Sequence, residues 1–158
     1  DLHSFPTRRS SDLAILVCRS NFGFPRRQAN GTDYNRVNLL MAVLEKRVGL
    51  QMGEYDAYVN LAGGMKLAEP SLDLGICMAL ISSFKNKPIG DDVIAFGEVG
   101  LSGEVRSVNM ADSRVQEAEK LGFKTCIVPK ALESKLKKSA KNINIVGVSS
   151  VADAMNYI

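Results

Sequence analysis

The sequence predicts a single α/β domain with a mixed sheet and packed helices, and three observations support this. The chain has 158 residues, which is enough to bury one core. Its hydrophobic content is 46% and its charged content 23%, as in ordinary globular domains. Strand-like and helix-like segments alternate through its second half, which favours some parallel strand pairing.

The first half contains two expected strands and one expected helix. Residues 14–18 form a short apolar run and predict a strand, whereas 21–31 contains glycine and proline and predicts a loop. A helix is expected to begin at Thr32 or Asp33, since either side chain can cap it. Its apolar face has helical spacing and consists of Val37, Leu40, Met41, Leu44 and Val48. A strand is expected over 57–62.

The second half begins with a helix that is apolar on nearly all sides. Residues 71–84 therefore predict a central buried helix rather than a surface helix. Glycine punctuation between 97 and 105 predicts two short strands joined by a tight turn. The other expected elements alternate: strand 93–96, helix 110–121, strand 125–128, helix 131–140, strand 143–148 and helix 151–157.

The first 13 residues do not match the rest of the chain. They are polar, lack periodicity and resemble translated adapter sequence. We expect 1–13 to be a non-native or disordered tail and 14–158 to be the domain. Excluding the tail also removes His3, the only histidine of the chain.

The cysteines and the hydropathy pattern favour a cytoplasmic protein without a metal. Cys18, Cys77 and Cys126 are far apart and lie in apolar runs, so we expect buried free thiols in a reducing compartment. With no CxxC pair and no histidine in the domain, neither a zinc site nor any cofactor is expected. No apolar stretch reaches about 18 residues, so no membrane span is expected.

Ser71 has two interpretations. It opens an apolar run after Pro70, and such a serine is either a nucleophile or a helix N-cap. A nucleophilic serine needs a base, and the domain has no histidine to supply one. We therefore favour the N-cap.

A basic segment is the strongest indication of a partner. From Arg19 to Arg47 there are six basic and two acidic residues, and such clustering is typical of phosphate contacts. A solvated helix face with subunit contacts explains the same pattern. The candidate DNA-binding residues are Arg26, Arg27, Arg36, Lys46 and Arg47.

Two further charged groups carry weaker indications. The lysines of 130–141 fall on more than one helix face and predict a solvated surface. Glu98 and Glu104 are candidates for pairing with Arg106 or Arg114 across a subunit interface.

Several motifs in the same order resemble one known family. The chain resembles the C-terminal Lon-like domain of the bacterial RadA/Sms recombination and repair proteins, and the resemblance covers 14–158. The motifs that carry it are Gly63-Gly64-Met65-Lys66-Leu67-Ala68-Glu69-Pro70-Ser71-Leu72-Asp73-Leu74, then 97–106 and 114–124, with 22–27 and 35–47 upstream.

This resemblance implies a Lon protease-like fold and a role in DNA recombination. Family members form hexameric rings on DNA, and the ATP-dependent parent drives branch migration. The zinc-finger and RecA-like ATPase domains of that parent protein are expected partners. Neither is expected within this chain, in which no Gly-x-x-x-x-Gly-Lys-Ser/Thr phosphate loop occurs. The implied partners are DNA and further copies of the chain, with no membrane.

The resemblance also bears on catalysis. Lon proteases use a serine after Gly-Pro and a lysine further along as its base, and these positions fall at Ser71 and Asp112. A carboxylate cannot replace a neutral amine, so both positions are interpreted as vestigial and the domain as non-catalytic. Two alternatives stay open: a Lon-like peptidase with a displaced Ser71–Lys66 dyad, and a pure oligomerisation scaffold.

Overall fold

The computed structural model describes residues 3–5, 13–21, 23–61 and 69–158. Its first sheet has the strand order β1-β2-β4-β3, where β1–β2 and β2–β4 pair antiparallel and β3–β4 parallel. The strands are β1 (His3–Phe5), β2 (Leu13–Arg19), β3 (Arg27–Asn30) and β4 (Tyr55–Leu61).

A second, parallel sheet comes from the other half of the chain. Its order is β5-β8-β9, and the antiparallel pair β6–β7 stands beside it. The parallel pairing and the glycine-punctuated hairpin that the sequence predicts are thus confirmed. These strands are β5 (Val93–Ala95), β6 (Glu98–Val99), β7 (Val105–Arg106), β8 (Thr125–Pro129) and β9 (Asn144–Val148).

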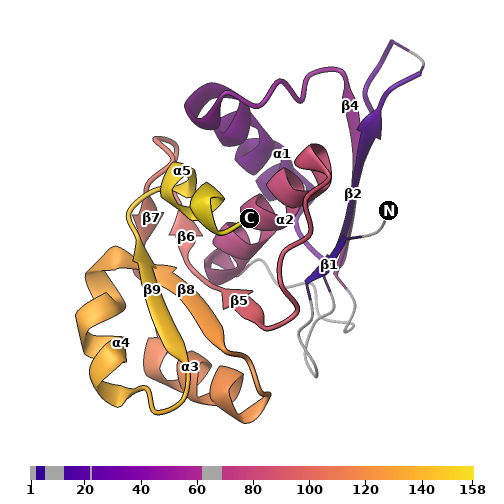
Figure 1. Ribbon diagram of the computed structural model, residues 1–158. Coiled ribbons are helices and arrows are strands. Elements are labelled where there is room, and N and C mark those ends of the chain that lie inside the picture. Colours follow the sequence, from indigo (N-terminus) through magenta and orange to yellow (C-terminus); the bar gives the residue numbers. More distant parts are fainter. Residues whose placement is uncertain (1–2, 6–12, 22, 62–68) are drawn as a thin grey trace.

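Helices fill the space between and around the two sheets (Figure 1). Asp33 caps the first of them, as the sequence predicts, by accepting a hydrogen bond from the Asn35 amide at 2.9 Å. The helices are α1 (Tyr34–Val43), which continues as a π-turn over Leu44–Val48, α2 (Asp73–Lys85), α3 (Ala111–Lys120), α4 (Glu133–Ser139) and α5 (Val151–Ala154). Short 3₁₀ turns cover Pro70–Leu72, Lys130–Leu132 and Met155–Tyr157.

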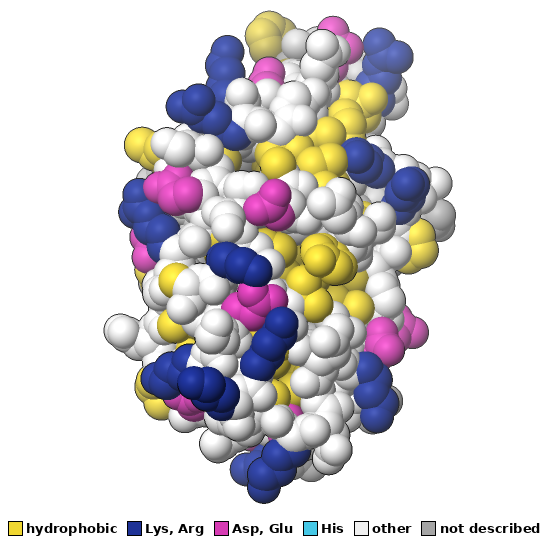
Figure 2. Space-filling view, turned by 60° about the vertical axis from the view of Figure 1, so that its left-hand side comes forward, with side chains coloured by type: hydrophobic (Ala, Val, Ile, Leu, Met, Phe, Trp, Pro, Cys, Tyr) yellow, Lys and Arg dark blue, Asp and Glu magenta, His cyan; other side chains and the backbone are white. Residues whose placement is uncertain are grey.

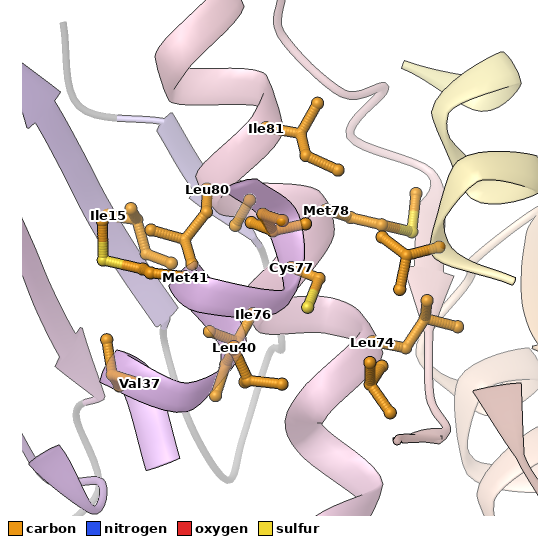
Figure 3. Close-up of a cluster of buried hydrophobic side chains, with 14 of the residues drawn as sticks. Ile15, Val37, Leu40, Met41, Leu74, Ile76, Cys77, Met78, Leu80 and Ile81 are labelled. Atoms are coloured by element: carbon orange, nitrogen blue, oxygen red, sulfur yellow. The ribbon is translucent and has the colours of Figure 1, made fainter. Parts of the chain in front are cut away.

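The central helix α2 organises the larger core. Every residue from Asp73 to Ser83 is buried, so the expected buried helix is confirmed. Figure 3 shows side chains of β2 and α1 on one side of α2, while Leu74 and Met78 point to the other. A helix covered on all sides is stabilised mainly by the apolar surface it removes from water.

A smaller core lies under the parallel sheet. It joins α3, β8 and α4 through side chains such as Val115, Val128 and Leu136. The helical spacing on α3 predicts this face, because Val115 and Ala118 are both buried.

The expected loop over 21–31 is wrong in part, because Arg27–Asn30 forms β3. This segment has no alternating apolar pattern, and its pairing with β4 imposes the extended conformation. Gly31 then ends the strand with a φ of +79°, and a Cβ there would lie 2.0 Å from the Leu61 carbonyl oxygen. Only glycine fits this approach.

Within the first 13 residues, the structure describes β1 against β2 and Leu13 as the first, buried residue of β2. The interpretation of this segment as non-native stays a prediction. Of the helices in the described ranges, none combines the length and apolar character needed to cross a membrane.

Glu133 ties α4 to β9 and gives a pH-dependent prediction. It accepts from the Gly147 amide at 3.1 Å and pairs with Lys130 and Lys137, and these partners, Lys130 first, lower its pKa from 4.5 to about 2. Because the pKa of Glu133 is lower in the folded state than in the unfolded state, its carboxylate stabilises the folded state at pH values above about 4.5. This stabilisation is lost as the pH falls from about 4.5 to 2. We expect Glu133→Gln to lower Tm at neutral pH.

Calorimetry from neutral pH to pH 2 checks this. The Tm difference between the wild type and Glu133→Gln should shrink as the pH falls. A difference that stays constant over this range would contradict the assigned contacts.

Candidate functional site

Ser71 lies in a buried corner, and its hydroxyl donates a hydrogen bond to a carboxylate. The 3₁₀ turn Pro70–Leu72 places the residue at 3% exposure, and its Oγ is 2.5 Å from Oε1 of Glu69. The Nη2 of Arg114, on α3, donates to the same Oε1. The corner is thus a three-membered polar chain that joins α3 to the beginning of α2.

The charges of this corner do not favour an activated serine. The Ser71 hydroxyl first, and then Arg114, lower the pKa of Glu69, so its carboxylate is a weaker base than usual. A weak base cannot remove the proton of a serine hydroxyl. The predicted N-cap role is also wrong, because the residues that cap this 3₁₀ turn and α2 are Glu69 and Leu72, without a side-chain hydrogen bond.

Asp112 lies in the first turn of α3 but has other partners. Its Oδ2 is 3.2 Å from Nζ of Lys135, and its Oδ1 accepts from Ser139 at 3.2 Å. Lys135 is the main cause of its lowered pKa. Arg114, two residues later, reaches the Ser71 corner instead. Lys66, the base of the alternative dyad, lies outside the described residues.

A cavity of about 370 Å³ opens beside Ser71. Its walls come from β2, β4, α2, β5 and α3, and they are mostly apolar, with Arg114 and Glu117 among the polar groups. Among its described lining residues there is no lysine or histidine to act as a base. The mostly apolar lining suits an apolar group.

Asp73 forms the second polar contact of this region. It is fully buried and accepts from Nε of Arg36 at 3.0 Å, from Nη2 of Arg36, and from the Val99 amide at 3.1 Å. Arg36 also donates to the Val99 carbonyl at 3.2 Å. The hydrogen bond to Asp73 raises the pKa of Arg36 further above its already high value. This pair joins α1, α2 and β6.

The five candidate DNA-binding residues differ in their surroundings. Arg36 is held by Asp73, and Arg27 donates to Sδ of Met41 at 2.8 Å and to the Met52 carbonyl at 3.4 Å. Arg47 is exposed and reaches the Leu101 carbonyl at 3.3 Å, beside the β6–β7 turn. Arg26 and Lys46 are exposed as well.

The remaining predictions about charged residues concern the ion pairs of Glu98 and Glu104 and the surface lysines. Arg106 pairs with Glu104 at 2.6 Å and with Glu98 at 3.7 Å, so neither contact requires a second subunit. Figure 2 shows Lys and Arg side chains spread over one face with Asp and Glu between them. The surface drawn there is therefore mixed in charge.

The thiols agree only in part with the expectation. Cys77 and Cys126 are buried, and burial raises the pKa of both, that of Cys126 to about 12, so these thiols are inert. Cys18 is exposed, which contradicts its predicted burial: it points away from the core on β2, where alternate residues face solvent. Over the described residues, no three His, Cys, Asp or Glu side chains gather as metal ligands.

Sequence reasoning missed the partners of the two central residues. The sequence analysis identified no partner for Glu69 or Asp73, and it considered Arg114 only as a candidate partner of Glu98 or Glu104. The available signal was the pattern Glu69-Pro70-Ser71-Leu72-Asp73 itself, since two carboxylates at the beginning of a buried helix require cationic partners.

Removing Asp73 should destabilise the fold strongly. Asp73→Ala leaves Arg36 and the Val99 amide without their acceptor, and breaking such a pair costs about 3–5 kcal/mol of the free energy of unfolding. Urea denaturation measures this, with the exposed pair Arg19–Glu54 as the reference.

The control variant Glu54→Ala should cost less than about 1 kcal/mol. Asp73→Asn keeps an acceptor for the Val99 amide, so its loss of unfolding free energy should lie between those of Asp73→Ala and Glu54→Ala. This variant replaces Asp73→Ala in the comparison if Asp73→Ala does not fold. Equal effects of Asp73→Asn and Glu54→Ala would contradict the role of the buried pair.

Comparison with known proteins gives both a family and a set of relatives. The chain is 50% identical over 145 residues to DNA repair protein RadA of Halalkalibacterium halodurans, 49% over 144 to that of Bacillus subtilis, and 41% over 145 to that of Escherichia coli. These alignments cover 91%, 91% and 92% of this chain but 31% of each relative, so the chain spans about a third of their length. The model of the family described as subunit ChlI of Mg-chelatase matches residues 31–131, well over half of the chain, and the chain therefore belongs to this family.

Proposed function

We propose that the chain is a non-catalytic Lon-like domain of a RadA-type DNA repair protein. In this role it forms a platform for a ring of subunits and contributes DNA contacts during recombination and branch migration. The observation that carries the proposal is the identity of 41–50% to proteins named DNA repair protein RadA over about nine-tenths of the chain. Because the chain spans a third of those proteins, we assign ATP hydrolysis and the zinc finger to the other two thirds.

The Ser71 corner supports the non-catalytic part of the proposal. The hydroxyl of Ser71 donates to Glu69, and Arg114 neutralises that carboxylate. Each group already has a structural partner, whereas a nucleophile needs a base that accepts its proton. A cytoplasmic location agrees with three free thiols.

The exposed cations support weak, sequence-independent DNA contacts. We assign these contacts to Arg26, Lys46 and Arg47, because these three residues are exposed whereas Arg27 and Arg36 are partly buried. Phosphate contacts carry no sequence information, and a few per domain give low affinity. A ring would multiply them through the effective concentration of linked sites, which gives the platform a physical purpose.

Salt-dependent DNA binding tests the proposal. We expect duplex DNA to bind the chain with an affinity that falls as salt rises, measured by fluorescence anisotropy of a labelled duplex. Arg26→Ala/Lys46→Ala should reduce the slope of log K against log salt by about 2, since each lost phosphate contact removes about 0.9.

Lys87→Ala/Lys120→Ala is the matched control. It removes the same charge from two exposed positions, one just after the C-cap of α2 and one at the end of α3. It should leave the slope within about 0.5 of the wild-type value, because no phosphate contact is lost. Folded protein that binds no DNA at low salt would contradict the DNA-binding role.

A further inference from the structure

The turn between β6 and β7 presents a leucine to water. Leu101 is 64% exposed within residues 100–104, which we call the Leu101 turn. An aliphatic side chain in this position adds little to the core of its own chain. Its burial against another surface would stabilise that contact through the apolar area removed from water.

Hydrogen bonds fix the backbone of the Leu101 turn. The Gly100 amide donates to the Glu104 carbonyl, and the Gly103 amide donates to the Gly100 carbonyl, both at 3.0 Å. From the end of α1, Nε of Arg47 donates to the Leu101 carbonyl at 3.3 Å. The turn is therefore set before a partner arrives, which lowers the entropy cost of binding.

The cavity beside Ser71 is an apolar space that can receive such a side chain. Its volume is about 370 Å³, whereas an apolar cavity of about 150 Å³ already holds a benzene ring. Met110 lines the cavity and is 72% exposed, so its side chain lies at the mouth. A methionine side chain is flexible and can adapt to the group that enters.

The mouth of the cavity carries a negative charge. Glu117 lines the cavity and is exposed. The other charged residue of the described lining, Arg114, is already paired with Glu69. A partner with a cation beside its apolar group is therefore favoured.

The Leu101 turn has a cation in the matching place. Arg47 is exposed and contacts the Leu101 carbonyl. Within the turn, the carboxylate of Glu104 is neutralised by Arg106 at 2.6 Å. The turn thus combines an apolar side chain with a neighbouring positive charge, and the cavity combines apolar walls with a negative charge.

The two surfaces lie on different sides of the domain. Figure 1 shows the β6–β7 turn next to α5, whereas α3, β5 and the beginning of β2, which wall the cavity, lie at the other end of the view. The turn therefore cannot fill the cavity of its own chain. Contact between two different surfaces of identical chains is heterologous, and its repetition gives a ring when the rotation closes.

We propose that the Leu101 turn of one copy inserts into the cavity of the next copy, with Arg47 facing Glu117. The inference rests on the proposed ring-forming function and specifies the surfaces that meet. In the ring, the phosphate contacts then fall to Arg26 and Lys46. One turn is small beside the roughly 1,200 Å² of a stable interface, and ring closure compensates because each copy is held on two sides.

Sedimentation velocity of the whole chain over a concentration series tests this inference. Leu101→Asp should weaken association at least roughly tenfold, because its carboxylate must lose water to enter an apolar cavity. Ser113→Trp should do the same, since it places a bulky ring at an exposed lining position, whereas Ser113→Ala should not. Tyr34→Ala, which removes an exposed ring outside both surfaces, should leave association unchanged.

An equal mixture of the two disruptive variants distinguishes this contact from a two-fold interface. Leu101→Asp retains its cavity and Ser113→Trp retains its turn, so one intact contact remains between them. The mixture should form dimers and nothing larger, whereas each variant alone stays monomeric. An interface through other surfaces would give the same assembly for the mixture as for each variant alone.

Cross-linking locates the contact. In a Cys18→Ser background, which removes the exposed thiol, copies with Leu101→Cys should form disulfides with copies carrying Ser113→Cys under mild oxidation, as identified by mass spectrometry. Assembly that persists unchanged in Leu101→Asp would overturn this inference and leave the ring-forming function in place. Assembly without the cross-link would also overturn it and leave the cavity to another occupant, such as an unrelated peptide or a small apolar molecule. A wild type that stays monomeric at about 1 mM would overturn both.

Discussion

The buried carboxylate of Asp73 is the constraint on which the arrangement of this domain depends. It begins the central helix α2 and receives donors from Arg36 on α1 and from the Val99 amide on β6. A buried charge without partners is costly, so α1 and the β6–β7 pair must lie where they satisfy it. The Gly97 amide and carbonyl, which bond Ser71 and Leu74 at 2.9 and 3.0 Å, fix the same end of α2 from a second direction.

The same constraint acts on the Ser71 corner. The chain just before α2 is fixed by Gly97, so Glu69 is presented to α3, where Arg114 meets it. The Ser71 hydroxyl donates a second hydrogen bond to that carboxylate. The hydrogen bonds among Ser71, Glu69 and Arg114 thus join the beginning of α2 to α3, beside the apolar cavity.

Local sequence patterns predicted most helices and strands. The arrangement of the candidate site depends instead on contacts between residues that are far apart in the sequence. The uniform apolar character of 72–84 predicts the burial of α2, and alternating elements predict the parallel strands of the second half. By contrast, β3 consists mostly of polar residues, and its extended conformation depends on pairing with β4. Arg36 lies 37 residues from Asp73, and Arg114 lies 45 residues from Glu69, so no short motif records either pair. Arg36 consequently resembled a DNA-binding residue in the sequence.

The claim that this corner holds the fold together rather than performing chemistry has one direct test. A fluorescent fluorophosphonate bonds covalently to serine hydroxyls that a base has activated. Gel fluorescence should show the same low labelling for the wild type and for Ser71→Ala, because the Ser71 proton is held by a carboxylate of lowered pKa. Rapid labelling of the wild type that disappears in Ser71→Ala would contradict the account and restore the peptidase interpretation.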